Sequence, residues 1–339
     1  MKKTVSRIGA IAGRLVFAAA LVSSFGLASC KSTPKEPEQK AEKPVKTETA
    51  EVEAPTDLNP IALLSNDSSI YARLPAAKHK SLVKEILIEE IPNIQEGDID
   101  LITSRLGIVW TGQGTVEDRS RTEIVATGSI PSIALSSSLT KAKGWTKTKY
   151  TAKSTEKALA LGYGNEFRYY GHPDTNFKIS LMYKDLLGLA GSIEPMLDRC
   201  AVHQELEKGK RTDWISKESD DILFFITRPG QYLRNMIGGT INVSTDYIYG
   251  NLRATASGDY DMTMNMHISD TRTITALKSM LNLAFGLTGG SVTQTDDETL
   301  CVSGVPLTRK QIVGVITRDP ITGKHYNVVD GKVTEENVK

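Results

Sequence analysis

Long apolar runs are the first feature that this 339-residue chain lacks. An N-terminal run covers residues 15–27. It is too short to cross about 30 Å of hydrocarbon, which takes about 20 helical residues. No later stretch is both long and apolar enough either. We therefore expect no transmembrane helix in the mature chain.

Catalytic signatures are missing as well. The sequence contains no H-E-x-x-H, G-x-S-x-G, Walker or C-x-x-C motif. Two S-x-x-K strings, at residues 81–84 and 138–141, lack the S-D-N and K-T-G companions that penicillin-recognising enzymes carry. The loop HPDTN, residues 172–176, is typical of a turn. The five histidines are scattered: His79, His172, His203, His267 and His325. We expect no enzyme activity, cofactor or metal, with an unrecognised hydrolase as an alternative.

An excess of positive charge is the third absence. Residues 1–29 hold four of the 41 basic residues and none of the 40 acidic ones. Without that segment the chain is slightly acidic, and it has no long basic block. Binding to nucleic-acid phosphates needs a concentrated basic face. We therefore expect no nucleic acid among the partners.

What the sequence does contain is a targeting segment. Basic residues precede the apolar run, and small residues follow it, as in a secretory signal peptide covering residues 1–29. The string Leu27-Ala28-Ser29-Cys30 resembles the lipobox of bacterial lipoproteins. The resemblance implies that Cys30 becomes the first mature residue and is acylated, for example with palmitate, as a membrane anchor. The alternative is an ordinary secreted protein cut near an alanine or serine.

The lipobox also indicates a location in the cell envelope. In the lipoprotein family an aspartate after the cysteine retains some members on the inner membrane. Lys31 occupies that position here, so the outer membrane is favoured over the inner one.

Residues 30–65, which follow the signal peptide, are rich in Pro, Glu, Lys and Thr. Such a segment buries too little apolar surface to offset its ordering entropy, and we expect a disordered, extended tether.

The globular part is expected to have an α+β fold. In residues 66–215 strands are predicted at 68–75, 107–116, 121–130, 146–151, 159–170 and 176–183, and helices at 76–91, 132–143 and 184–197. In residues 216–322 strands are predicted at 220–229, 246–256, 261–268 and 299–307, and helices at 230–239, 271–287 and 309–316. Residues 323–339 form a C-terminal tail.

The two halves begin with the same order of strands and helices. Strand, helix, strand, strand, helix, strand is the order of a ferredoxin-like unit. Two βαββαβ repeats are therefore one hypothesis, and two dissimilar halves of one larger sheet are the other. Both predict an antiparallel sheet with helices packed on it, in one or two domains.

Two cysteines remain after Cys30. Cys200 lies near a predicted helix end, and Cys301 lies in a predicted strand. An oxidising compartment would allow a disulfide between them, but sequence does not give their separation. A disulfide and two buried free thiols both remain open.

Two predicted helices are unusually apolar. Residues 271–287 place Met280, Leu283 and Leu287 beside an already apolar face, and their only charges are Arg272 and Lys278. Residues 184–197 are similarly rich in leucine. Such wide apolar arcs are typical of helices buried on more than one side. Alternatively, these helices contact lipid. The candidate lipid-contact residues are Leu186, Leu187, Leu189, Ile193, Ile274, Leu277, Leu281 and Phe285.

These features together resemble a known group of proteins. The lipobox, the Pro/Glu/Lys tether and the apolar helices are similar to those of treponemal outer-membrane lipoproteins. Members of that group use amphipathic helices to sense and enter lipid. The resemblance implies a non-enzymatic envelope lipoprotein whose folded part binds membrane lipid. An envelope scaffold or surface module that binds envelope proteins is the alternative, and the oligomeric state is not predicted.

The stretch DMTMNMHISD raises a separate question. Strand alternation places Met262, Met264, Met266 and Ile268 on one face and His267 on the other. Thioethers suit Cu(I), but no second Met/His cluster is present to complete a site. The favoured interpretation is a strand with an adaptable buried face, on which the following helix, 271–287, packs.

Overall fold

The chain folds around a single large antiparallel sheet. The computed structural model describes residues 53–90, 96–114, 122–129, 131–132, 136, 139–161, 163–173, 177–227, 229–230, 245–317, 325–329 and 332–336. The predicted signal peptide and Cys30 lie outside these residues. So do residues 231–239 of the helix predicted at 230–239, and residues 133–135 and 137–138 of the Ser-rich helix predicted at 132–143. The α+β fold class is confirmed.

Twelve strands form the sheet in the order β11-β12-β10-β9-β8-β1-β2-β3-β7-β6-β5-β4. Their bounds are β1 Ile70–Pro75, β2 Leu106–Gln113, β3 Thr122–Gly128, β4 Thr146–Thr151, β5 Glu166–Gly171, β6 Lys178–Tyr183, β7 Leu186–Ala190, β8 Ile222–Ile226, β9 Tyr247–Ala254, β10 Tyr260–His267, β11 Ser291–Asp296 and β12 Thr299–Leu307. Every pairing within it is antiparallel. The predicted tail contains a separate hairpin, β13 His325–Val329 and β14 Lys332–Glu336.

The two halves of the chain meet at the pairing of β1 with β8. From this centre β1-β2-β3 and β8-β9-β10 run outward in sequence order. A split β-α-β unit instead has another strand between the two strands that its helix connects. Here β1 and β2 pair directly although helices separate them in sequence. The ferredoxin-like arrangement is therefore not formed, and the hypothesis of one larger sheet is correct.

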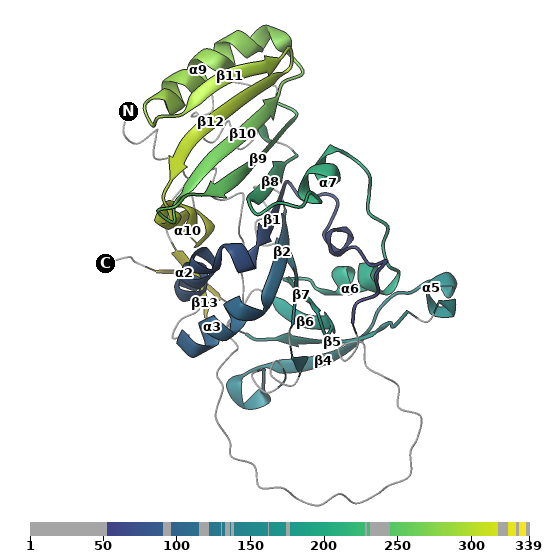
Figure 1. Ribbon diagram of the computed structural model, residues 1–339. Coiled ribbons are helices and arrows are strands. Elements are labelled where there is room, and N and C mark those ends of the chain that lie inside the picture. Colours follow the sequence, from purple (N-terminus) through teal and green to yellow (C-terminus); the bar gives the residue numbers. More distant parts are fainter. Residues whose placement is uncertain are drawn as a thin grey trace, which may run out of the picture.

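Helices cover the two faces of the sheet unequally (Figure 1). One face carries α2 Lys80–Glu90, α3 Glu96–Arg105, α9 Ile274–Gly286 and α10 Arg309–Thr317. The other carries the short helix η2 Pro60–Leu63, α6 Glu194–Ala201 and α7 Lys210–Ile215. Short helices also occur at η3 Ala76–Lys78, η4 Lys141–Lys143, α5 Glu156–Ala160 and η5 Thr271–Thr273. Among the described residues no helix is long and apolar enough to span a bilayer.

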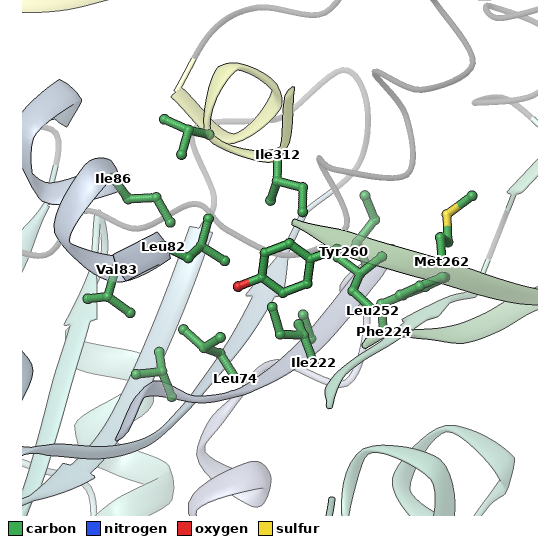
Figure 2. Close-up of a cluster of buried hydrophobic side chains, with 14 of the residues drawn as sticks. Leu74, Leu82, Val83, Ile86, Ile222, Phe224, Leu252, Tyr260, Met262 and Ile312 are labelled. Atoms are coloured by element: carbon green, nitrogen blue, oxygen red, sulfur yellow. The ribbon is translucent and has the colours of Figure 1, made fainter. Parts of the chain in front are cut away.

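The larger core lies where α2 and α10 meet the central strands. Figure 2 shows Leu82 and Ile86 of α2, Ile312 of α10, and Tyr260 of β10 in this cluster. Because these elements come from both halves of the chain, the core is continuous across the β1–β8 junction.

The folded part begins earlier than residue 66. Leu58, Ile61, Leu63 and Leu64 are buried in the second core, between η2, the sheet and α6. The predicted tether is therefore too long at its C-terminal end. The apolar run from Ile61 to Leu64 has enough surface to pack, unlike the Pro/Glu/Lys segment before it.

Candidate membrane-contact site

Helix α9 lies at one end of the molecule, on β11 and β12 (Figure 1). Its inner face carries Ile274, Leu277, Leu281 and Phe285, which are all buried. They belong to the same core as Val302 of β12. Four of the eight predicted lipid-contact residues therefore face the sheet.

The outer side of α9 is also apolar. Leu283 and Leu287 are each 64% exposed. With the exposed Ala276 and the partly exposed Met280 they follow a spacing of four, three and four residues. Residues at that spacing lie on one side of a helix. We call these four residues the outer stripe of α9.

Little charge accompanies the outer stripe. Arg272, just before α9, donates from Nε to Oδ1 of Asp270 at 2.8 Å. Lys278 is the one charged residue within the helix. The other exposed side chains of α9 are small and polar: Thr275, Ser279 and Asn282. The helix thus presents an apolar stripe beside a neutral polar one.

The glycines after α9 fix a tight turn into β11. Gly289 has a φ of +90°, in the left-handed region that glycine adopts readily. A Cβ added at Gly290 would lie 2.8 Å from Val305 Cγ2 and 3.2 Å from Phe285 Cβ. This turn therefore holds the C-terminal end of α9 against β12.

The methionine strand has the predicted alternation. Met262, Met264 and Met266 of β10 are buried on the face that α9 and α10 cover. His267 points the other way, with Nδ1 2.9 Å from Asp246 Oδ2 and Nε2 3.2 Å from Glu298 Oε2. Because the ring nitrogens face two carboxylates, His267 does not face the sulfurs. Helix α9 packs mainly on the neighbouring strands β11 and β12 rather than on β10.

The prediction of a helix at residues 184–197 is wrong in its first half. Leu186, Leu187 and Leu189 lie in β7, a strand paired on both sides with β3 and β6. Leu187 and Leu189 enter one core and Leu186 enters the other. A strand buried on both faces is continuously apolar and resembles a buried helix in sequence. Ile193 is fully buried just before α6. These four residues are core residues.

Both described cysteines are free thiols. Cys200 is fully buried in α6, and Cys301 is partly exposed in β12, near the opposite end of the sheet. Burial raises the pKa of both thiols above the ordinary value. They therefore remain protonated, weak nucleophiles at neutral pH.

Three further exposed apolar side chains were not singled out from the sequence. Leu159 and Leu161, in and just after α5, are 51% and 59% exposed, and Ile88 of α2 is 50% exposed.

The prediction of one strand at residues 159–170 is wrong in its first half, because α5 ends at Ala160 and β5 begins at Glu166. Gly162 and Gly164 between them were the available signal for a break.

Comparison with known proteins relates this architecture to a protein family. Residues 55–313 match the family described as outer membrane-associated lipoprotein TP0453. The chain belongs to this family. The predicted resemblance to treponemal outer-membrane lipoproteins is thereby confirmed, and so is the predicted location in the cell envelope at the outer membrane.

Solved structures agree with the family assignment at the level of the fold. Crystal form I of TP0453 has a TM-score of 0.56 and 16% identity, with 76% of this chain and 96% of that chain covered. Crystal form III has a TM-score of 0.57 and 17% identity, with 76% and 97% covered. No curated protein matches the chain.

Proposed function

We propose that the folded part is a non-enzymatic membrane-binding module whose contact surface is the outer stripe of α9. The observation that carries this proposal is the exposure of Leu283 and Leu287 on a helix whose opposite face is already buried. The family's description as membrane-associated supports it. Contiguous exposed apolar surface is typical of protein or membrane interaction sites.

The outer stripe requires no rearrangement to reach lipid. If α9 instead left the sheet, four buried side chains of its inner face would lose their packing. Each such side chain contributes about 1.5 to 3 kcal/mol by burial. Contact through the outer stripe keeps the inner face on β11 and β12. We therefore place the candidate lipid contact at Met280, Leu283 and Leu287 rather than at Leu277 and Leu281.

The stripe and a lipid anchor at Cys30 would act together. Inserting two leucines yields about 4 kcal/mol before the cost of association, which gives weak binding alone. An anchored chain converts that weak contact into an intramolecular one with a raised effective concentration. In this proposal the acyl anchor first holds the chain at the membrane, and the outer stripe of α9 then contacts the lipid.

Liposome flotation tests the contact. The mature chain with Cys30→Ser avoids binding through acyl groups. Because the contact alone is weak, a detectable fraction of this chain should float when phosphatidylcholine vesicles are in large excess. A Leu283→Glu/Leu287→Glu variant should remain at the bottom of the gradient. The matched control is Asn282→Glu, which adds a charge to the same helix without removing apolar surface. Flotation of the double variant equal to that of the control would refute the site.

Protein binding is the second candidate, favoured by the exposed edge of the sheet at β11. Five of the six residues of β11 are exposed, and β12 pairs with only one of its sides. An extended segment of an envelope protein could add to such an edge. Pull-down from envelope extracts that is lost with Thr293→Pro, without flotation of the unacylated chain, would favour this candidate.

A further inference from the structure

The edge of the sheet opposite α9 concentrates positive charge. Residues 141–171 contain seven basic residues, Lys141, Lys143, Lys147, Lys149, Lys153, Lys157 and Arg168, and only two acidic ones, Glu156 and Glu166. The mature chain as a whole is slightly acidic. The charge is therefore strongly asymmetric between this region and the rest of the protein.

The pairing of β4 with β5 brings these charges together. Lys149 lies directly opposite Arg168, and Lys147 lies opposite Tyr170 with its Nζ 5.8 Å from the ring centroid. Like charges directly opposite each other destabilise a sheet. Lysines on an edge strand do discourage strand addition. That explanation covers β4 but not Lys153 and Lys157, which lie beyond it.

The tip of the same hairpin is apolar. Helix α5 connects β4 to β5 and projects at the outer end of the hairpin (Figure 1). Leu159 and Leu161 are more than half exposed there, while Ala158 on the other side of α5 is buried. Lys157 is exposed beside them, and the side chain of Lys153 is 89% exposed with its Nζ 3.9 Å from Asp198.

We propose that the β4–α5–β5 hairpin is a second membrane-contact element, one that recognises anionic phospholipid head groups. Its lysines would bind the phosphates, and Leu159 and Leu161 would enter the boundary between head groups and acyl chains. Lysine beside exposed leucine is the composition of interfacial segments, whereas the outer stripe of α9 has almost no positive charge. The leucines favour a lipid surface over an acidic protein. The inference extends the proposed membrane association but uses a different element.

Vesicle composition separates the two elements. Binding of the mature chain carrying Cys30→Ser is measured on phosphatidylcholine vesicles and on equimolar phosphatidylcholine and phosphatidylglycerol. The test variant is Lys149→Gln/Lys153→Gln/Lys157→Gln. The control, Lys80→Gln/Lys208→Gln/Lys310→Gln, makes the same change in net charge at exposed lysines elsewhere. A further variant, Leu159→Ser/Leu161→Ser, removes the apolar tip without changing charge.

The parent and the control should bind the anionic vesicles more tightly than the neutral ones. The hairpin lysine variant should lose roughly a hundredfold in partition coefficient on anionic vesicles, because each lysine near such a surface contributes about fivefold. On neutral vesicles it should match the parent. The Leu159→Ser/Leu161→Ser variant should bind both vesicles less tightly.

The inference is overturned if the hairpin variant keeps the full preference for anionic vesicles. It is also overturned if the parent shows no such preference, including the case in which it binds soluble polyglutamate instead. If the parent ignores neutral vesicles but loses anionic binding with the hairpin variant, the proposed contact through α9 fails and this inference stands.

Discussion

His79 illustrates how a single buried residue depends on its protonation state. Its Nε2 lies 2.8 Å from the backbone carbonyl oxygen of Asp220. A carbonyl oxygen can only accept a hydrogen bond, so Nε2 carries the proton and donates it. Nδ1 lies 3.0 Å from the Tyr260 hydroxyl, which then donates to it. Burial lowers the pKa of His79 below its ordinary value. The folded state therefore holds the neutral imidazole, which joins the start of α2 to Asp220, just before β8, and to Tyr260 of β10.

This arrangement predicts a loss of stability in mild acid. Above about pH 6.5 His79 is neutral in both states and adds no pH dependence. As the pH falls below that value, the unfolded chain takes up a proton that the folded chain does not, so the free energy of unfolding decreases until the lowered pKa is reached. Urea unfolding between about pH 7.5 and pH 5 measures this slope. A His79→Phe variant should have a shallower slope, and equal slopes in the two proteins would contradict the assignment.

At the scale of elements, α9 is a helix with two apolar sides of different kinds. The wide apolar arc was visible in the sequence and indicated burial on more than one side. One side proved to be buried and the other exposed, and contact of the exposed side with lipid is our proposal. Periodicity alone could not assign the sides, because the side that the sheet covers is set by packing on β11 and β12, which the pattern of the helix itself does not contain. The predicted contact residues Leu277 and Leu281 consequently proved to be core, and Leu283 and Leu287 proved to be exposed.

Two substitutions on α9 should distinguish its sides in solution. Leu281→Ala removes a buried side chain and should lower the free energy of unfolding by about 3 kcal/mol. Leu283→Ala, two residues further along the helix, removes an exposed side chain and should change the free energy of unfolding by less than about 0.5 kcal/mol. Chemical denaturation of both variants measures the difference. Similar losses in the two would mean that α9 is buried on both sides.

Other elements show where local sequence is sufficient and where it is not. The strand β10 alternates between methionines and polar residues, and that period survives because only one face is covered. In β7 every residue is buried, so the period of two disappears. The polar edge strand β11, SVTQTD, was not predicted because one buried valine leaves almost no apolar pattern.

At the scale of the whole molecule, the sheet joins both halves of the chain and separates the two proposed contact regions. Helix α9 packs on one face of the sheet near the edge at β11, and the basic hairpin with α5 forms the other edge, at β4. The order of elements in the two halves was predicted only in part, since β7 was predicted as a helix, α5 as part of a strand, and β11 not at all. Their union into one sheet was not, because it depends on the pairing of β1 with β8, more than 140 residues apart.

The central claim is that the outer stripe of α9 enters the membrane while the helix stays on the sheet. A bimane label at Leu283→Cys, in the mature chain with Cys30→Ser and Cys301→Ser, tests it directly, because Cys200 is fully buried. With vesicles of phosphatidylcholine brominated in the acyl chains, the label at position 283 should be quenched. The same label at Asn282→Cys, on the polar stripe about 100° around the helix from Leu283, should stay fluorescent. Equal quenching at both positions, or quenching at neither, would contradict the account.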